Sequence, residues 1–442
     1  MSKKTENHVG YLPDESPSFG KLILFAFQQI LVMFPATVTV ALLTGFHVST
    51  TIFASGLATL CFIFITKGQI PLYYGSSFSY ISAITGITLV QEYGQIAPNE
   101  LIQKAQFGIM ASGLISIAAG IIIQRFGKDK IEKVLPPTVT GTIAMVIGIS
   151  LAVTAFTSAV GYDAATNSTD NLSWIVSMVT LVSTVLFSVY LKKGVLGQIP
   201  ILLGIAVGYI FSIIVGVNIP SILGESLITV PHFTLPTVSW EAVFAIMPIA
   251  IATIPESTAH LYQLDIYIND LSKRKNGKKY DIENKLGLNL IGDGVCDIIS
   301  ASIGGPAGTN YGENISTMAI TRNFSVKVLG AAAIITMFIS FFAPLTNFVN
   351  SVPSAVINGA CIYLFGVIAA QGLAIMVNKK VDLFDSKNLA IIAIITIIGI
   401  GGCYGFPNGL IPFMGFKLPA IATASIFGII FNFILNFGKP SE

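Results

Sequence analysis

Two glutamates and one histidine stand in otherwise apolar sequence. Glu256 and His260 are four residues apart in Ile-Pro-Glu-Ser-Thr-Ala-His, so a helix would carry them on one face. Glu313 stands in Tyr-Gly-Glu-Asn, within another stretch that is typical of a membrane segment. An ionisable group inside a membrane is costly and is retained for tasks such as holding a polar solute or relaying a proton. These residues predict a buried polar site, the alternative being a structural Glu–His hydrogen bond.

Other polar residues in apolar stretches have two interpretations each. Gln28 and Gln29 either line a site or form hydrogen bonds between helices. Asp293 either faces a cavity or caps a helix, and the structural role is favoured. The four cysteines are scattered and show neither metal nor disulfide spacing. No nucleophile–base set is recognisable, so we expect neither an enzyme nor a metal or organic cofactor.

The composition indicates which kind of element positions these residues. The chain has 442 residues, of which 53% are hydrophobic and only 10% charged, with a mean hydropathy of +0.78. A soluble domain has about 25% charged residues. Apolar runs near the membrane-spanning length recur from end to end, which predicts an all-α polytopic membrane protein. Hydropathy predicts 14 segments, at 20–43, 49–66, 70–90, 105–124, 136–157, 173–191, 196–216, 240–262, 286–304, 311–322, 326–348, 353–377, 388–403 and 417–437.

The basic residues predict the orientation. With the N-terminus inside, all of the 24 Lys and Arg residues except Lys104 and Lys417 fall in inside loops or tails. The positive-inside rule therefore favours an even number of spans, with both termini cytoplasmic, in the plasma (inner) membrane. The N-terminus lacks a cleavable signal pattern. Because the basic residues lie in loops, the net charge of +2 does not suggest a nucleic-acid partner.

A short repeat links the third and tenth segments. Leu-Tyr-Tyr-Gly-Ser-Ser-Phe-Ser ends at Ser79, and Thr-Asn-Tyr-Gly-Glu-Asn-Ile-Ser ends at Ser316. Aligning the Tyr-Gly pairs places Tyr74 over Tyr311, about half the chain apart and seven predicted spans away. Seven is odd, so the two halves would have opposite orientations. Inverted repeats with interrupted helices at matching positions are typical of transporters, whose site lies where the breaks meet.

The predicted breaks suit a particular kind of solute. Gly75 and Gly312 allow the backbone to leave the helix, and a helix that begins after a break points N–H groups and positive dipole into the cavity. A planar solute with alternating donors and acceptors, such as an oxo-pyrimidine, fits such a site. Its carbonyl groups would accept from backbone N–H, its ring N–H groups would donate to carboxylates, and Phe78 could stack on its face.

Three stretches resemble a known family. Tyr-Gly-Glu-Asn-Ile-Ser-Thr-Met-Ala-Ile-Thr-Arg, residues 311–322, is similar to the signature of the nucleobase–ascorbate transporters in its bacterial uracil-permease form. Residues 70–82 and 28–38 resemble the third and first helices of that family. The resemblance runs from about Gly20 to the last predicted span.

The resemblance implies an architecture. It comprises 14 helices in a 7+7 inverted repeat, with short strands or broken helices in segments 3 and 10. Residues 1–19 would be a cytoplasmic tail, 20–134 and 240–350 a core domain, and 135–239 and 351–442 a gate domain with a short C-terminal tail. Family members often form homodimers through the gate domains.

The resemblance also implies site roles. Glu256 and Glu313 would accept ring N–H groups, and the amides of Phe78 and Gly312 would contact carbonyl oxygens. His260, with Glu256, would take part in proton coupling, and Tyr311 would line the pocket. Further lining residues would be Gln29, Ser77 and Ser316.

Several residues depart from the family pattern. Gln29 replaces a histidine of the first helix, Ala259 and Ser316 replace glycines, and Phe365 replaces a tyrosine. Both carboxylates are kept, but the polar network around them is thinner.

The resulting prediction is a proton-coupled nucleobase importer with uracil as the favoured base, and Na⁺ coupling is left open. Purine-type members carry an amide near the position of Glu313, so the carboxylate favours uracil over xanthine or urate. A xanthine or urate symporter is the first alternative. An anion transporter of the same general fold is the second, although no Lys or Arg lies in mid-span beside the breaks.

Overall fold

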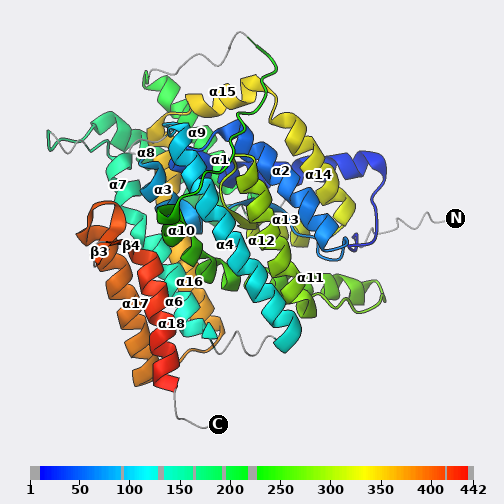
Figure 1. Ribbon diagram of the computed structural model, residues 1–442. Coiled ribbons are helices and arrows are strands. Elements are labelled where there is room, and N and C mark those ends of the chain that lie inside the picture. The colour runs from blue at the N-terminus through cyan, green and yellow to red at the C-terminus, as the bar shows by residue number, and fades with distance from the viewer. Residues whose placement is uncertain are drawn as a thin grey trace.

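Helices form most of the protein (Figure 1). The computed structural model describes residues 10–90, 94–127, 134–162, 166–191, 196–217, 226–413 and 416–436. The predicted terminal tails lie partly outside them, at residues 1–9 and 437–442. The α-helices are α1 (Phe19–Thr44), α2 (Val48–Ile65), α3 (Ile81–Thr88), α4 (Asn99–Phe126), α6 (Pro137–Ser150), α7 (Ala152–Ala159), α8 (Asn171–Tyr190), α9 (Pro200–Ile214), α10 (Trp240–Ile246), α11 (Ala250–Arg274), α12 (Leu286–Ser302), α13 (Gly312–Thr321), α14 (Val326–Ile339), α15 (Ala343–Ser351), α16 (Ser354–Asn378), α17 (Ser386–Gly405) and α18 (Ala420–Asn436).

Many of these helices match a bilayer. The described residues contain 8 helices that are long and apolar enough to cross a membrane. Shorter apolar helices cover 78–88, 200–214, 326–339 and 420–436. A helix rises about 1.5 Å per residue, so about 20 apolar residues cross the hydrocarbon layer. The predicted polytopic helical class is confirmed.

Two predicted segments have different limits in the structure. The segment expected at 240–262 continues to Arg274 as α11. Polar residues such as Gln263 and Asp265 lower the hydropathy there. This part of the helix is joined to the loop that follows it, since the Asn269 side-chain amide donates to the Tyr280 main-chain oxygen at 2.9 Å. The segment expected at 326–348 ends at Ile339, and a separate helix, α15, follows at Ala343.

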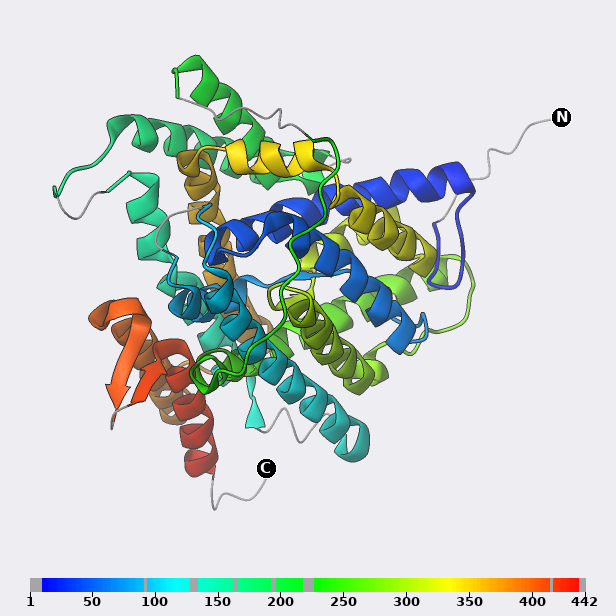
Figure 2. The ribbon, with the colours of Figure 1, turned by 45° about the horizontal axis from the view of Figure 1, so that its top comes forward.

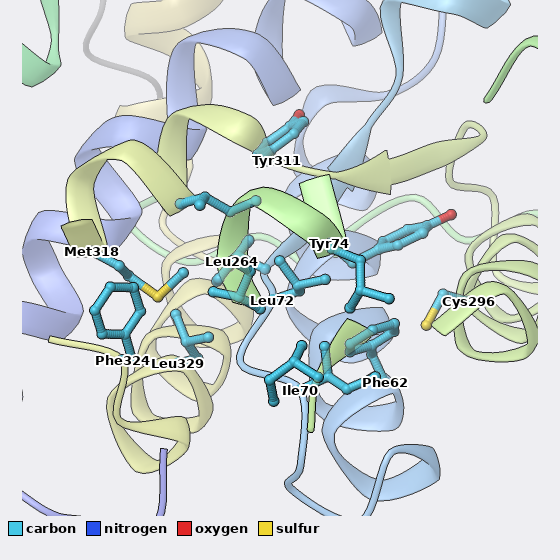
Figure 3. Close-up of a cluster of buried hydrophobic side chains, with 14 of the residues drawn as sticks. Phe62, Ile70, Leu72, Tyr74, Leu264, Cys296, Tyr311, Met318, Phe324 and Leu329 are labelled. Carbon is cyan, nitrogen blue, oxygen red and sulfur yellow. The ribbon is translucent and has the colours of Figure 1, made fainter. Parts of the chain in front are cut away.

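The predicted breaks are present as two short strands. β1 (Tyr74–Ser76) pairs antiparallel with β2 (Gly308–Asn310), with Gly75 opposite Thr309. Each strand needs a glycine: a Cβ on Gly75 would lie 2.3 Å from the ring of Tyr311, and one on Gly308 would lie 2.4 Å from the ring of Tyr74. Figure 3 shows both tyrosines beside the buried apolar cluster.

A short helix extends each strand. Residues 78–80 form a 3₁₀ turn that leads into α3, and Ser77 caps it by accepting from the Ser79 amide. α13 begins at Gly312, directly after β2. The N-termini of both helices therefore lie at the strand pair.

Helix packing falls into two groups. α1, α2, α4, α10, α12 and α14 pack mainly against one another, and α6, α7, α8, α9, α16, α17 and α18 do the same. Figure 2 shows α17 and α18 beside α6, on the opposite side of the molecule from α2 and α14. The strand pair and α13 lie with the first group, in contact with α1, α2, α11 and α12.

The segment just before α1 is fixed by polar contacts. Lys275 donates to Glu15 at 2.5 Å, and Lys278 donates to Asp14 at 2.9 Å. The Tyr280 hydroxyl also donates to Asp14, at 2.5 Å. We call Asp14, Glu15 and these three partners the N-terminal clasp. It ties the start of α1 to the loop after α11.

Candidate functional site

A cavity of about 370 Å³ lies beside the strand pair. Its wall combines both helix groups, with the strand pair, the 3₁₀ turn at 78–80, α11 and α13 on one side and α6, α8, α9 and α16 on the other. It extends toward the C-terminal ends of α11 and α16. Predicted site residues that line it are Ser77, Phe78, Glu256, His260, Tyr311, Gly312, Glu313 and Ser316.

The two glutamates enter the cavity from different elements. Glu256 stands one residue after Pro255 in α11 and accepts a hydrogen bond from the Ser79 hydroxyl at 3.3 Å. Glu313 stands in the first turn of α13, and its side chain is exposed to the cavity. The amide dipoles of α13 favour a carboxylate at its N-terminus. The site therefore presents two acceptor groups to a solute, and Glu313 has a stabilising dipole behind it.

His260 packs closely on the start of α13. A Cβ on Gly312 would lie 2.7 Å from His260 Nε2, so only glycine permits this approach. The other ring nitrogen, Nδ1, is buried and has no hydrogen-bond partner in the described part of the protein. Glu256 and His260 lie one helical turn apart on the same wall, as the spacing predicts.

Two side-chain atoms of strand β2 are also buried without a hydrogen-bond partner in the described part of the chain. Thr309 Oγ1 and Asn310 Oδ1 are buried without a partner among the described residues, and both residues line the cavity. An unpaired buried polar atom costs about 1–3 kcal/mol. Together with His260 Nδ1, these atoms are polar groups around the cavity that no described residue satisfies.

Tyr311 holds the strand crossing. Its hydroxyl donates to the main-chain oxygen of Ser76 at 3.0 Å and pairs with Thr37 Oγ1 at 2.9 Å. Its ring covers Gly75. Tyr311 therefore lines the cavity while it also joins α1, β1 and α13.

Gln29 does not line the cavity, contrary to its predicted role. It is 1% exposed, and its Oε1 accepts a hydrogen bond from Asn314 Nδ2 at 2.8 Å. The same amide donates to the Gln29 main-chain oxygen at 3.1 Å. Gln29 thus joins α1 to α13, which is the interhelical alternative. The sequence could not distinguish the two because they depend on the rotation of α1.

Asp293 belongs to a buried network behind the strands. It accepts hydrogen bonds from Ser257 and, at 2.7 Å, from Asn310 Nδ2. Asn289 donates to Ser257 at 2.7 Å, which extends the network along α12. Ser257 follows Glu256 directly, so the network touches the element that carries the site carboxylate. The favoured structural role agrees with these contacts.

Asp297 fixes the strand pair from the same helix. It accepts from the Tyr74 hydroxyl and, at 2.8 Å, from the Gly308 amide. The spacing of Asp293 and Asp297 in Gly-Asp-Gly-Val-Cys-Asp is one helical turn, which places both on one face of α12. That spacing was the available signal, but the partners came from distant segments.

The second helix group contributes residues that sequence reasoning missed. Ser188 and Tyr363 line the cavity and hydrogen-bond to each other. Gln371 lines it from α16, and on the opposite wall Gln263 of α11 was missed as well. These residues have uncharged polar side chains and belong to none of the recognised motifs, so nothing in the sequence distinguished them. Phe365 lies away from this cavity, in a neighbouring apolar cluster.

Curated proteins with similar sequences are permeases. The chain is 36% identical to a uracil permease of Bacillus caldolyticus, over 96% of this chain and 94% of the relative. It is 35% identical to the uracil permease of Bacillus subtilis (strain 168), over 100% and 98%. A putative pyrimidine permease of Escherichia coli (strain K12), RutG, is 32% identical over 98% and 94%.

Solved structures share the fold. The transmembrane domain of the cyanobacterial bicarbonate transporter BicA matches with a TM-score of 0.62 and 14% identity, over 95% of this chain and 98% of that one. Murine Slc26a9, an anion transporter in the inward-facing state, matches with a TM-score of 0.69 and 14% identity, over 98% and 72%. At such low identity, these matches concern the fold alone.

A family model confirms the relationship that the Tyr-Gly-Glu motif suggested. The model described as "Permease family" matches residues 20–408, which contain every residue of the cavity wall named above. The full-length similarity to uracil permeases agrees with it. The chain belongs to the permease family that comprises the nucleobase–ascorbate transporters.

Proposed function

We propose that this protein imports uracil by proton symport, binding the base in the cavity beside the strand pair. The observation that carries the proposal is the pairing of two cavity carboxylates, Glu256 and Glu313, with two helix N-termini at one site. The names of the full-length relatives support uracil as the substrate.

The proposed binding mode follows from hydrogen-bond complementarity. Uracil has two ring N–H donors and two carbonyl acceptors that alternate around its edge. Glu256 and Glu313 would accept from the N–H groups, and the amides of Phe78 and Gly312 would donate to the carbonyls. A hydrogen bond to a charged group contributes about 1.5–3 kcal/mol, and an analogue that lacks the partner would leave a carboxylate unpaired.

Proton coupling is assigned to the Glu256–His260 face of α11. His260 has an unpaired buried nitrogen and lies one helical turn from Glu256, so this face of α11 carries two proton-binding groups. Protonation of this face would favour loading of the base. Release on the other side of the membrane would follow loss of the proton.

The proposed architecture is two moving bodies. The first helix group, with α11 and α13, would form the core domain at 20–134 and 240–350, and the second would form the gate domain at 135–239 and 351–442. The division in helix packing supports this assignment. The reciprocal Tyr74–Gly308 and Tyr311–Gly75 contacts support an inverted 7+7 repeat of 14 spans. We further propose cytoplasmic termini, a site that faces the cytoplasm in this conformation, and a homodimer through the gate domains.

The alternative substrates fit the cavity less well. An anion would need a cationic wall, whereas the described lining residues include two glutamates and neither Lys nor Arg. Xanthine shares the pyrimidine edge of uracil and remains the alternative base. Competition of unlabelled xanthine with labelled uracil for uptake distinguishes the two bases.

Uptake into proteoliposomes tests the proposal. Purified protein is reconstituted, and labelled uracil uptake is measured with imposed pH and Na⁺ gradients and with unlabelled bases as competitors. We expect uptake that an inward proton gradient drives and that uracil inhibits better than xanthine. Uptake driven only by Na⁺ would overturn the proton coupling, and preferred inhibition by xanthine would overturn the choice of base.

A further inference from the structure

The protein has a second cavity. The loops that follow α11 and α16 lie on one side of the strand pair, and this cavity lies on the opposite side. Its volume is about 490 Å³. It is lined by α3 and α7, by the C-terminal ends of α1 and α17, and by the N-terminal half of α16. Its polar lining includes Ser82, Thr85, Ser150, Asn358 and Tyr404. In the proposed orientation, this is the outer side of the membrane.

A buried apolar layer separates the two cavities. Ile81, Leu151, Leu364 and Phe365 belong to one packed cluster, and Phe78 packs against it. Phe78 and Leu364 also line the site cavity, whereas Ile81, Leu151 and Phe365 line the outer one. We call these five residues the seal. It joins the second helix group to α3, which begins at Ile81 and packs on α1, α4 and α10 of the first group.

Asn358 is the feature of the outer cavity that points to a ligand. It is 3% exposed, lines the cavity and makes no hydrogen bond to any residue that the structure describes. Neighbouring polar groups are already bonded: Thr85 donates to the Ile81 oxygen at 2.9 Å, and Ser150 donates to the Ile147 oxygen at 2.7 Å. The side-chain amide of Asn358 can therefore hydrogen-bond to a solute in the cavity.

The position of Asn358 relates it to the seal. It precedes Phe365 by seven residues in α16, so both stand on one face of the helix. A solute bound to Asn358 would lie above Phe365. It could reach the site cavity once the seal opens.

The chemistry of the amide selects the solute. Asn presents an N–H donor and a C=O acceptor side by side in one plane, which matches the adjacent C=O and N–H on the edge of a pyrimidine base. The described lining contains no carboxylate, so binding would be weaker than at Glu256 and Glu313. We propose that this cavity is an outer subsite for a nucleobase, in which the amide of Asn358 hydrogen-bonds to the base; the proposal rests on the proposed function.

Cys403 provides a reporter because it lines the same cavity. Cys61, Cys296 and Cys361 are replaced by Ser or Ala, which leaves Cys403 as the sole thiol. Glu313→Ala is then added to remove binding in the site cavity. A membrane-impermeant methanethiosulfonate reagent is applied to proteoliposomes from the side opposite the basic loops, with and without uracil, and the labelling rate is measured.

We expect saturating uracil to slow labelling by at least about threefold, since a bound ligand covers most of a pocket of this kind. The slowing should survive Glu313→Ala and disappear on Asn358→Ala. The matched control Asn350→Ala, at an exposed asparagine of α15, should keep it. If Asn358→Ala changes the labelling rate without uracil, Asn358→Asp replaces it. That variant keeps the shape but removes the N–H donor, and protection should again be lost.

Any of three results would overturn the subsite. In the first, Cys403 does not react with the reagent at all. In the second, uracil slows its labelling only when Glu313 is present, and in the third, uracil still slows its labelling after Asn358 is replaced. Uracil uptake by the single-cysteine protein that retains Glu313 is measured in parallel. Uptake without protection refutes the subsite alone. The absence of both uptake and protection refutes the proposed function as well.

Discussion

At the residue scale, the proposed uracil site depends on two carboxylates that face a cavity in an otherwise apolar interior. Glu256 and Glu313 are 57 positions apart in sequence, and both reach one wall beside the strand pair. The two carboxylates differ in their present hydrogen bonds. Glu256 is already bonded to Ser79, whereas Glu313 stands free toward the cavity at a helix N-terminus.

Replacing Glu313 by Gln should weaken uracil uptake by about 10- to 100-fold, because one charged acceptor contributes about 1.5–3 kcal/mol. The change keeps the size of the side chain and so isolates the charge. Glu241→Gln, at an exposed position of α10, is the matched control and should transport normally. Initial uptake rates over a range of uracil concentrations give the comparison. If the Glu313→Gln variant and the wild type take up uracil at equal rates over this range, Glu313 does not belong to the site.

Asp293→Asn should lower stability because Asp293 accepts from both Ser257 and Asn310, and the new amide has only one acceptor oxygen. Disruption of a buried network of this kind costs about 1–3 kcal/mol. Thermal unfolding of the purified protein measures the change. An unchanged melting temperature together with lost uptake would instead place Asp293 in the transport reaction.

At the element scale, the strand pair is the feature that positions the site. The sequence allowed its prediction, because Tyr-Gly pairs recur at the third span of each half and Gly permits the break. The register was beyond prediction. It depends on Tyr74 covering Gly308 and Tyr311 covering Gly75, which are contacts between segments more than 200 residues apart.

Gly308→Ala should disrupt this crossing. A Cβ there would lie 2.4 Å from the Tyr74 ring and 2.5 Å from the Gly75 oxygen, so backbone as well as side chain must move. Overpacking of this kind costs about 1–3 kcal/mol. The expected result is a lower melting temperature and weaker uracil binding. Gly330→Ala is the control, since a Cβ there meets only Ile63, at 4.0 Å. Equal stability of the two variants would contradict the role of the crossing.

The N-terminal clasp makes a pH-dependent contribution. Hydrogen bonds from Tyr280 and then Lys278 hold the pKa of Asp14 below its ordinary value of 3.8. A lowered carboxyl pKa adds stability above the ordinary value, and that stability is lost as the pH falls through the folded-state pKa. Because Asp14 is largely exposed, the contribution is only about 0.2–1 kcal/mol.

Asp14→Asn should therefore lower the melting temperature at pH 7, and the difference from wild type should shrink below pH 3.8. Tyr280→Phe removes the main cause of the pKa shift. The two changes should be non-additive in a double-mutant cycle at pH 7. Full additivity, or a difference that persists in acid, would show that Asp14 stabilises the protein in another way.

At the scale of the whole molecule, two cavities flank one seal. The polytopic helical class and the permease family could be predicted from hydropathy and from the Tyr-Gly-Glu motif. The site residues of α11 and α13 could be predicted because charge in apolar sequence is conspicuous. Gln29, Asn358 and the Ser188–Tyr363 pair could not be assigned, because their roles depend on how helices rotate against distant partners.

Joining the two helix groups across the seal should stop transport. Ile81→Cys with Phe365→Cys, treated with a bifunctional thiol reagent, should abolish uracil uptake, and reduction of a cleavable linker should restore it. Both residues lie in one packed cluster but in different helix groups. Val139→Cys with Ile395→Cys joins α6 to α17 within one group and should leave uptake intact. Uptake that survives a complete Ile81–Phe365 cross-link would contradict relative movement of the groups.

The most direct measurement is an experimental structure of the protein with uracil bound. We expect the base in the cavity beside the strand pair, with its N–H groups at Glu256 and Glu313 and its carbonyl oxygens at the amides of Phe78 and Gly312. Uracil bound elsewhere, with both carboxylates remote from it, would contradict the proposed site.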